Sequence, residues 1–250
     1  MSGPQYYDSD VVIVGAGGAG LRAAIAARDC GARVLVICKS LLGKAHTVMA
    51  EGGIAAALGT VDSRDNWRVH FRDTLLGGKM LNDWRAAELH AKEAPQEVFQ
   101  LERWGALFDR TDDGGILQRL FGGHSFARLA HVGDRTGLEL LRTLQDAAVA
   151  RGIDVLMEHT VTKIAVRHGA AVGLVGYERS TGKLFAVSAA SIIIATGGAG
   201  RLYAVNSNSW ETTGDGQALA FQAGAELTDM EFVQFHPTAW SGLQAFVGCS

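Results

Sequence analysis

The clearest pattern of hydrophobic and polar positions is a short apolar run that leads directly into glycines. Val11 to Val14 precede the stretch Gly15-Ala16-Gly17-Gly18-Ala19-Gly20. An apolar run without polar alternation is typical of a buried parallel strand. The residues after the glycines predict a helix through about Arg28, and a second apolar run, Arg33 to Cys38, predicts a second strand. These elements form a strand–helix–strand unit around a GxGxxG pattern. The alternative is a glycine-rich turn in another α/β fold.

The glycines of this turn have separate expected uses. Gly15 allows a tight turn, Gly17 lets backbone approach a pyrophosphate, and Gly20 lets the helix pack closely on the strand. The helix N-terminus would point its unpaired N–H groups at the phosphates. Simple dinucleotide folds end the second strand with an acid, but Cys38-Lys39-Ser40 stands here, which disfavours an NAD site. Lys39 and Ser40 are therefore either ribose or phosphate ligands or a solvated strand end.

The middle of the chain has mainly helical periodicity. Gly52-Gly53 before an alanine-rich run predicts a backbone approach to a ligand, followed by a short helix. Residues 63–105 read as helical, and we expect Pro95 to begin a new helix. A short extended piece over 105–109 and a turn over 112–115 should follow. Beyond them, an amphipathic helix is predicted through about Ala150; its apolar face comprises Leu138, Leu141, Leu144 and Ala148.

From Asp154 to Thr196 the period changes to two, which predicts strands. The runs 154–158, 162–166, 171–178 and 183–189 would form a small antiparallel meander, with turns at Gly169 and at Thr181-Gly182. The run 191–195 predicts another buried strand, which returns to the parallel sheet. The order of these pieces predicts an α/β, Rossmann-like domain with a helical insertion and a small antiparallel β-meander. A plain dehydrogenase would instead continue with regular strand–helix units.

Four polar or aromatic residues can be interpreted either as structural residues or as residues of a binding site. Asp215, which opens a helix through about Gly224, either accepts from a ribose or caps the helix. Phe121 precedes two glycines and either packs beside a bend or lines a small pocket. His46 taken alone would be a surface or satisfied core histidine. Pro237 restricts His236 to extended geometry at the end of an extended run; a histidine held there can line a site, but a lone one more often does not.

Composition narrows the functional classes. The chain has 250 residues and a net charge of −3, which gives no reason to expect nucleic acid as a partner. No stretch of roughly eighteen apolar residues is present, so we expect no membrane span, and the polar, acidic start predicts no signal peptide. The three cysteines form no CxxC pair. That spacing argues against an iron–sulfur or zinc site in this chain, so no metal ligands are expected, and fits a reducing compartment.

The motifs, taken together and in order, resemble the flavoprotein subunit of succinate dehydrogenase and fumarate reductase. The stretches that carry the resemblance extend from about Asp10 to Thr238 and are VVIVGAGGAGLRAA, HTVMAEGGIAAAL, DNW, QRLFGGHS, DRTG, ATGGAGRLY, TGDG and MEFVQFHPT. No single motif is decisive, but the ordered set is highly specific.

The resemblance implies that FAD, and not NAD, occupies the glycine turn. It implies covalent attachment of the flavin through its 8α-methyl carbon to His46, which related proteins such as L-aspartate oxidase lack. The alkyl bond would raise the flavin potential and make oxidation of succinate feasible. The cofactor-binding residues that the resemblance implies are Gly15, Ala16, Gly17, Gly18, Ala19, Gly20, Lys39, Ser40, His46, Thr47, Gly52, Gly53, Ala195, Thr196, Gly197 and Asp215.

The resemblance also implies a reaction and an assembly. Phe121 would pack beside the bound dicarboxylate, and His236 would bind a substrate carboxylate. Hydride would pass from one carbon of succinate to flavin N5 while a proton leaves the other carbon, with the reverse direction equally open. Iron–sulfur and membrane-anchor subunits would be partners. The expected location is cytoplasmic, peripheral to the inner face of the cytoplasmic membrane through those partners.

The chain departs from the family pattern after Thr238. The sequence predicts an FAD-binding domain over 1–238 that lacks a re-entrant segment, and an aberrant tail over 239–250 where a capping domain would begin. The family's proton-shuttle arginine lies in that capping domain, so no catalytic residue is expected in this chain. The alternative functions are a truncated, non-catalytic FAD-binding remnant and an oxidoreductase similar to L-aspartate oxidase. Poor solubility is expected where apolar surface lacks its cover.

Overall fold

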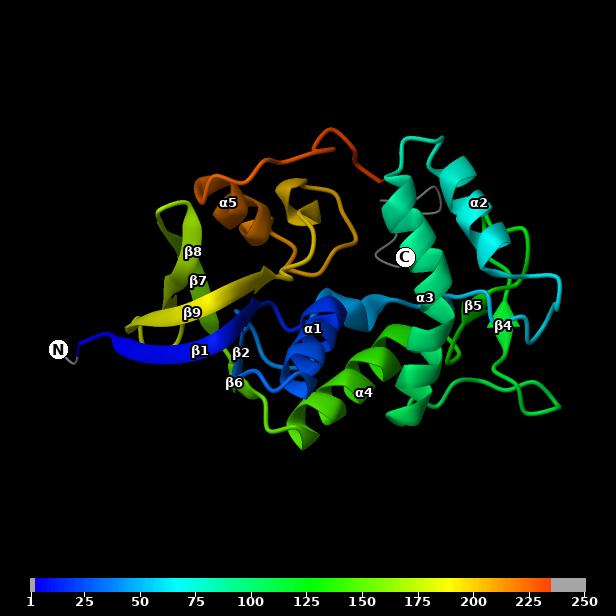
Figure 1. Cartoon of the computed structure of the whole chain (residues 1–250), viewed down its shortest axis with the longest axis horizontal. Coiled ribbons are helices and arrows are strands. Elements are labelled where there is room, and N and C mark those ends of the chain that lie inside the picture. The colour runs from blue at the N-terminus through cyan, green and yellow to red at the C-terminus, as the bar shows by residue number, and fades with distance from the viewer. Residues whose placement is uncertain (1–2, 235–250) are drawn as a thin grey trace. The chain divides into compact units, whose positions relative to one another are not determined.

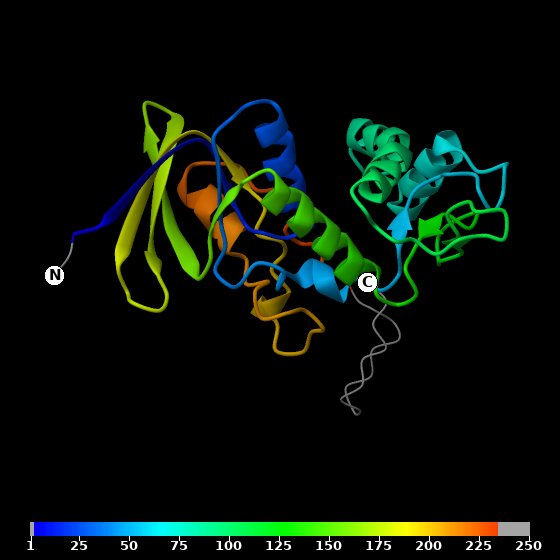
Figure 2. The same ribbon diagram turned by 90° about the horizontal axis from the view of Figure 1, so that it is seen from below.

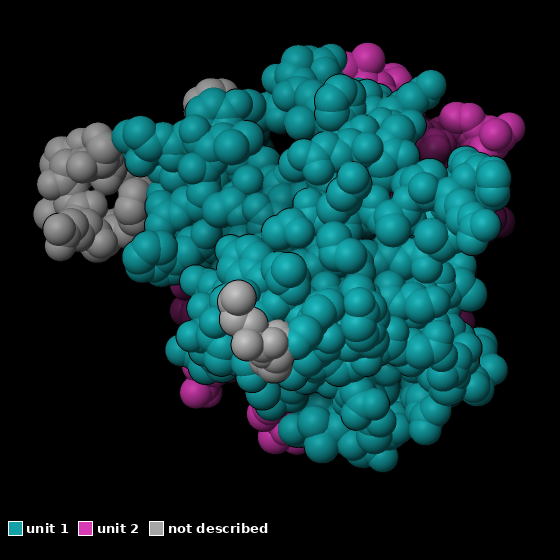
Figure 3. Space-filling model, turned by 90° about the vertical axis from the view of Figure 1, so that its left-hand side faces the viewer, with its two compact units in different colours: residues 1–47, 144–247 teal, residues 48–143, 248–250 magenta. Residues whose placement is uncertain are grey.

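The computed structural model describes residues 3–234 and divides the chain into two compact units, coloured separately in Figure 3. Unit 1 combines Met1–Thr47 with Leu144–Val247, and unit 2 consists mainly of Val48–Thr143. Each unit has its own sheet, so each is described separately. The expected tail, residues 239–250, and His236 lie outside the described residues.

Unit 1 is built on one six-stranded sheet, which contains both the parallel strands and the predicted meander (Figure 1). Strand β1 pairs in parallel with β2 and β9, and β2 pairs in parallel with β6. Strands β7, β8 and β9 form the antiparallel part. In spatial order the strands are β6 (Asp154–Leu156), β2 (Val34–Ile37), β1 (Gln5–Val14), β9 (Leu184–Ile194), β8 (Ala170–Glu178) and β7 (His159–Arg167).

Strand β9 is the element that joins the two parts of this sheet. Leu184 to Ser188 pair with β8, whereas the strand pairs with β1 from Phe185 to Ile194. The prediction of two separate strands over 183–189 and 191–195 is therefore wrong, because the single strand β9 pairs with both β8 and β1. The expected burial of the second run is also wrong. Ile193 and Ile194 are each 37% exposed, since β8 stops pairing with β9 at Ser188.

Two other strands differ from the sequence-based expectation. The run 154–158 is expected in the meander, but Leu156 pairs in parallel with Ile37 of β2. Alternation identifies a strand without identifying its neighbour, and this error follows from that limit. Strand β1 begins at Gln5 rather than at Val11, because Gln5–Ser9 pair with Phe185–Ala189.

Helices α1 (Gly18–Asp29) and α5 (Asp215–Gln222) cover opposite faces of the sheet (Figure 1; Figure 2). Val12, Leu35 and Phe185 belong to one buried cluster with Leu219 of α5. Ile13 and Val36, one residue further along their strands, point to the other face, where α1 packs on β1 and β2. This three-layer packing places the N-terminus of each helix at the carboxyl edge of the parallel strands.

Unit 2 contains helices α2 (Trp67–Gly77) and α3 (Trp84–Arg103), the first part of α4 (Thr136–Ala150) and a small sheet. The side chains of Asn66 and Asp83 cap α2 and α3 by accepting from backbone N–H groups of the first turn. The small antiparallel sheet has the order β3 (Ile54–Ala55), β5 (Leu129–Ala130), β4 (Gln118–Arg119).

Pro95 does not begin a helix but lies inside α3. A proline within a helix removes one backbone hydrogen bond and costs about 3 kcal/mol. Here the helix continues because its buried stripe runs past the proline on both sides. The residues of that stripe are Ala87, Ala91, Ala94, Val98 and Leu101.

The short helix expected after Gly52-Gly53 is also absent, because Ile54 and Ala55 pair with β5 instead. The predicted extended piece over 105–109 is not a strand, whereas the turn over 112–115 is confirmed. Helix α4 is confirmed, with Leu141, Leu144 and Ala148 buried, but Leu138 is 49% exposed and does not belong to the apolar face. The segment from Met230 begins with a turn and not with a strand.

Candidate functional site

The glycine turn at the carboxyl end of β1 has a backbone that tolerates no side chain at two positions. Gly15 has φ of +113°, and a Cβ there would lie 2.2 Å from the carbonyl oxygen of Ala195. A Cβ on Gly20 would lie 2.0 Å from the carbonyl oxygen of Gly15. These two glycines therefore bring β1, α1 and the end of β9 together. The uses expected for Gly15 and Gly20, a tight turn and close helix packing, agree with this geometry.

Helix α1 begins after Gly17, and its first turn is contacted by Thr47. The backbone N–H of Gly18 donates to Oγ1 of Thr47 at 3.0 Å. A Cβ on Gly17 would lie 3.3 Å from the same oxygen. Thr47 follows His46 in a short 3₁₀ turn, η1 (His46–Met49). The histidine that the resemblance singles out therefore lies next to a residue bound to the helix N-terminus.

His46 is half-buried and has a defined backbone donor. The N–H of Ser209 donates to Nδ1 of His46 at 3.2 Å. Burial lowers the pKa of His46 below its ordinary value, and the carboxylate of Glu211 opposes that shift. The imidazole is therefore neutral at pH 7 with Nδ1 as the acceptor, which leaves Nε2 as the protonated nitrogen. No sequence signal points to Ser209, because its contribution comes from the backbone.

Lys39 and Asp215, far apart in the sequence, form an ion pair in unit 1. Nζ of Lys39 lies 2.7 Å from Oδ2 of Asp215 and 2.5 Å from Oγ1 of Thr213, which donates to Oδ1 of Asp215 at 2.6 Å. Burial raises the pKa of Asp215, but the hydrogen bonds from Lys39 and Thr213 lower it more, so the net direction is downward. Lys39 is thus ion-paired and 25% exposed at this strand end, and its contact with a ribose or phosphate stays a prediction.

Asp215 is not the N-cap of α5, because Gly214 occupies that position with φ of +78°. The carboxylate lies in the first turn, where negative charge is favoured, and it contacts Lys39 and Thr213. Thr213 is a site residue that sequence reasoning does not select. Ser40 has only its backbone engaged by described residues, since its carbonyl accepts from Sγ of Cys38 at 3.1 Å and from the N–H of Glu158.

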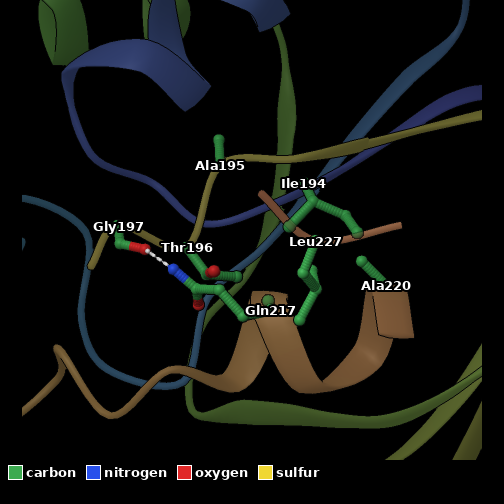
Figure 4. A pocket seen from close by; sticks show the side chains of 8 residues that line it. Ile194, Ala195, Thr196, Gly197, Gln217, Ala220 and Leu227 are labelled. Carbon is green, nitrogen blue, oxygen red and sulfur yellow. Dashed lines mark hydrogen bonds between the residues drawn. The ribbon is translucent and has the colours of Figure 1, made fainter. Parts of the chain in front are cut away.

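A hollow of about 260 Å³ lies beside the expected cofactor residues Ala195, Thr196 and Gly197 (Figure 4). Ile194, Ala220 and Leu227 supply apolar side chains, and Gln217 donates to the carbonyl of Gly197 at 3.3 Å. The hollow is smaller than the ~300–1,000 Å³ of typical ligand sites, so it can hold only a part of a dinucleotide.

Gly216 has a packing role beside this hollow. A Cβ there would lie 2.0 Å from Oγ1 of Thr196 and 2.6 Å from Cγ2 of Ile194. The sequence suggests a close approach of Gly216 to a ligand. The chain's own side chains take that space, and they allow α5 to lie against the end of β9.

Three further predicted site residues belong to unit 2. Gly53 has φ of +121°, and a Cβ there would lie 2.9 Å from the carbonyl oxygen of Ala130, so this glycine permits the pairing of β3 with β5. The carbonyl of Gly52 accepts from Nε of Arg119 at 2.8 Å. Phe121 is half-buried just after β4. The ligand contacts of these three residues stay predictions, as does the substrate contact of His236.

The residues of unit 1 fit a phosphate-containing dinucleotide. The turn from Gly15 to Gly17 carries no side chain larger than that of alanine and leads into the N-terminus of α1, where N–H groups and the helix dipole favour a pyrophosphate. At the same edge of the sheet, Lys39 offers a cation, and the carboxylate of Asp215 offers oxygens that can accept from ribose hydroxyls. Thr47 Oγ1 already accepts from one of the first-turn N–H groups. These groups place donors and acceptors of both charges near the N-termini of α1 and α5, which is the chemistry that phosphates and ribose hydroxyls require.

Among the described residues, no helix has the length and hydropathy needed to cross a membrane. The sequence matches the family model described as "FAD binding domain" over residues 10–249.

Curated relatives match nearly all of this chain. An uncharacterized FAD-dependent oxidoreductase of Methanocaldococcus jannaschii is 46% identical over 236 residues, which cover 94% of this chain and 43% of the relative. A chain of the CoM/CoB fumarate reductase of Methanothermobacter marburgensis is 43% identical, with 94% and 43% covered. The succinate dehydrogenase flavoprotein subunit of Rickettsia bellii is 39% identical, with 93% and 40% covered. The chain thus spans about two fifths of the length of these relatives.

Solved structures give the same picture. A chain of the Mycobacterium smegmatis Sdh1 complex with UQ1 is 55% identical with a TM-score of 0.92; the match covers 94% of this chain and 41% of that one. A chain of E. coli quinol fumarate reductase is 40% identical with a TM-score of 0.93, and 98% and 42% are covered. These scores agree with the Rossmann-like fold and small antiparallel meander expected from the sequence.

Proposed function

This chain belongs to the FAD binding domain family and is similar to flavoproteins of succinate dehydrogenase and fumarate reductase, and we propose that it binds FAD covalently at His46 for interconversion of succinate and fumarate. Membership makes the chain part of an FAD-dependent oxidoreductase family. The covalent bond, the substrate and the assembly are the proposed part, since the chain spans about two fifths of its relatives.

The hydrogen bond from Gly18 N–H to Thr47 Oγ1, 3.0 Å long, supports this proposal most directly. It fixes the residue next to His46 at the helix N-terminus that would face the pyrophosphate. A flavin joined to the same pyrophosphate would then lie within the reach of a side chain in η1. The N–H of Ser209 occupies Nδ1 of His46 and so limits where the ring could bond to the flavin. A bond to the 8α carbon would form at Nε2, with loss of the proton that Nε2 carries.

Bound FAD would supply the two-electron chemistry, and the residues of this chain would hold it in place. We propose that Gly15, Gly17 and Gly18 accommodate the pyrophosphate and that Lys39, Ser40 and Asp215 contact the ribose or a phosphate. The remaining contacts proposed for the cofactor come from Ala16, Ala19, Gly20, Thr47, Gly52, Gly53, Ala195, Thr196 and Gly197.

On the substrate side we propose roles for Phe121 and His236. Phe121 would pack beside the dicarboxylate, and His236 would donate to one of its carboxylates. The proposed assembly would include iron–sulfur and membrane-anchor subunits, with this chain peripheral to the membrane on its cytoplasmic side. The similarity to flavoprotein chains of succinate dehydrogenase and fumarate reductase complexes supports such partners.

Ultraviolet fluorescence of the denatured chain on a gel tests the covalent bond. The wild-type chain should give a fluorescent band after denaturation, and His46→Ala should give a dark one. His168→Ala is the matched control, because His168 is an exposed histidine in the turn between β7 and β8 of the same unit. Its band should remain as bright as the wild type.

Two results would contradict the proposal in different ways. A wild-type chain that binds flavin in its native state, but gives a dark denatured band, would have noncovalent FAD. That result would favour the L-aspartate-oxidase-like alternative, which production of hydrogen peroxide from L-aspartate would establish. A folded wild-type chain without any flavin would contradict the FAD site itself. Reduction of a dye by succinate, measured with the chain and its partner subunits, tests the substrate.

A further inference from the structure

Unit 2 contains a fully buried arginine between two carboxylates. Arg128 has no exposed surface; its Nη2 lies 2.7 Å from Oδ1 of Asp65, and its Nη1 lies 3.0 Å from Oδ2 of Asp73. Asp73 also accepts from the N–H and the hydroxyl of Ser125, at 2.9 and 2.8 Å. This group therefore joins helix α2, which carries Asp73, to the segment between β4 and β5.

His70 and His124 interact with the charges of Arg128 and Asp73, and the ring of His90 lies beside His70. We call His70, His90 and His124 the histidine cluster. The ring of His70 on α2 is 2% exposed; its centroid lies 5.5 Å from that of His90 on α3 and 6.1 Å from that of His124. In the part of the chain that the structure describes, neither Nδ1 of His70 nor Nδ1 of His124 has a hydrogen-bond partner. If either ring became doubly protonated, its Nδ1–H would therefore have no hydrogen-bond acceptor.

We propose that the histidine cluster is an acid-sensitive attachment for the segment 121–128. Protons added to the cluster would place cations against Arg128 and loosen the segment from α2. The segment would remain attached while the rings are neutral.

The balance of charges around His70 favours this direction. Burial lowers the pKa of His70 most, and Arg128, His90 and His124 lower it further; Asp73 alone opposes them, and the pKa falls to about 4. The pKa of His124 is also lowered, by burial and by Arg128, against Asp73 and Asp65. Burial raises the pKa of Asp65 above its ordinary value, so the negative charge that this carboxylate places beside Arg128 weakens earlier as the pH falls.

The segment held in this way includes Phe121. The N–H of His124 donates to the carbonyl of Phe121 at 3.3 Å, and Ser125 donates to Asp73 on α2. Loosening the cluster would therefore release the turn over 121–124. Any consequence for a dicarboxylate rests on the proposed function, but the attachment itself does not, so the test uses neither flavin nor substrate.

Amide hydrogen exchange of the 250-residue chain between pH 7.5 and 5 tests the proposal, with protection factors that correct for the intrinsic effect of pH. Since His70 titrates near 6.5 when freed and near 4 when held, opening should increase about tenfold per pH unit below 6.5. Amides of 121–128 should therefore lose about 30-fold in protection from pH 7.5 to 5, about 15-fold of it below pH 6.5, where half of the freed His70 is already protonated. Amides of β1 and β9 in unit 1 should lose none of theirs through this route.

Two variants assign the effect. His70→Gln should remove most of the acid dependence in 121–128, and His124→Gln serves the same purpose if His70→Gln does not fold. His168→Asn, on an exposed turn of unit 1 with φ of +52°, should keep the wild-type dependence. Three results would overturn the proposal. Protection of 121–128 could stay unchanged in acid, or it could fall equally in both units. Both glutamine variants could also lose as much protection in acid as the wild type.

Discussion

The backbone N–H of Ser209 and Nδ1 of His46 are 3.2 Å apart, although 163 residues separate them in the sequence. A backbone N–H can only donate, so this contact requires an unprotonated Nδ1. It therefore defines the tautomer of the histidine to which the flavin is proposed to attach.

We expect His46 of the flavin-free chain to be neutral at pH 7 with its proton on Nε2. Burial lowers its pKa below 6.5, so protonation costs stability as the pH falls from 6.5 toward the lowered value. Long-range proton–nitrogen NMR of the ring checks both points. A proton on Nδ1, or a pKa above 6.5, would contradict the Ser209 contact.

Gly20→Ala should destabilise unit 1 by about 3 kcal/mol, the upper end of ordinary overpacking costs. Its Cβ would lie 2.0 Å from the backbone oxygen of Gly15, and neither group can rotate away. Gly77→Ala, in the last turn of α2, meets nothing within 4 Å and should be neutral or stabilise by roughly 0.5–1 kcal/mol. Urea denaturation of both variants measures the difference. Equal stabilities would mean that the turn relaxes freely.

The Lys39–Asp215 pair should show a coupling free energy of about 1 kcal/mol in a double-mutant cycle with Lys39→Met and Asp215→Asn. Both side chains are partly shielded, with 25% and 37% exposed. The more exposed Lys92–Glu88 pair of α3 is the control and should give about 0.3–0.5 kcal/mol.

The same pair predicts a pH dependence. The pKa of Asp215 is lowered from 3.8, so its contribution to stability is complete above that pH and is lost as the pH falls further. Lys39→Met leaves the burial of Asp215 but removes one of its donors, so the titration should move to higher pH. Carboxyl chemical shifts followed by NMR would show this, and an unchanged titration would deny the ion pair.

Arg128→Met should cost about 3–5 kcal/mol at neutral pH, because it leaves Asp65 and Asp73 buried without their cation. The deficit should shrink in acid as those carboxylates take up protons. Arg64→Met removes an arginine that is 76% exposed and should change stability by less than about 1 kcal/mol. Unfolding free energies at two pH values test this. A deficit that is constant with pH would mean lost packing and not unpaired charge.

Local pattern predicts much of unit 1. The run before Gly15 and the run at Val34 are strands, and a helix follows the glycines. Patterns of this kind reflect which face of an element is buried, and they identify an element without its neighbours. The failures follow from that limit: one strand, β9, serves two neighbours, and β6 joins β2 instead of the meander.

Local rules fail where packing outweighs them. Pro95 is a helix breaker by itself, yet α3 continues through it because apolar residues on both sides share one buried face. Gly53, expected to let a ligand approach, makes room for the carbonyl of Ala130.

The sequence allows candidate site residues to be selected, but it does not predict which of them contact one another. Motifs select the glycine turn, Lys39, His46, Thr47 and Asp215. Their contacts are not predictable in this way, since the sequence offers no sign that Lys39 reaches Asp215 or that Thr47 accepts from Gly18. Sequence reasoning does not select Thr213, because only Asp215 of the TGDG motif has an expected role, and it misses Ser209, which acts through its backbone.

The pairing of β1 with β9 also fixes an order of events during synthesis. Val12 pairs with Ile192, so β9 must leave the ribosome before β1 acquires this neighbour. Closing so long a loop makes folding slow, and the glycine turn lacks its Ala195 contact until then. Unit 2 is synthesised in between, so its contacts can form first. The glycine turn is thus synthesised well before the strand end that completes it, and a growing chain exposes it for that interval.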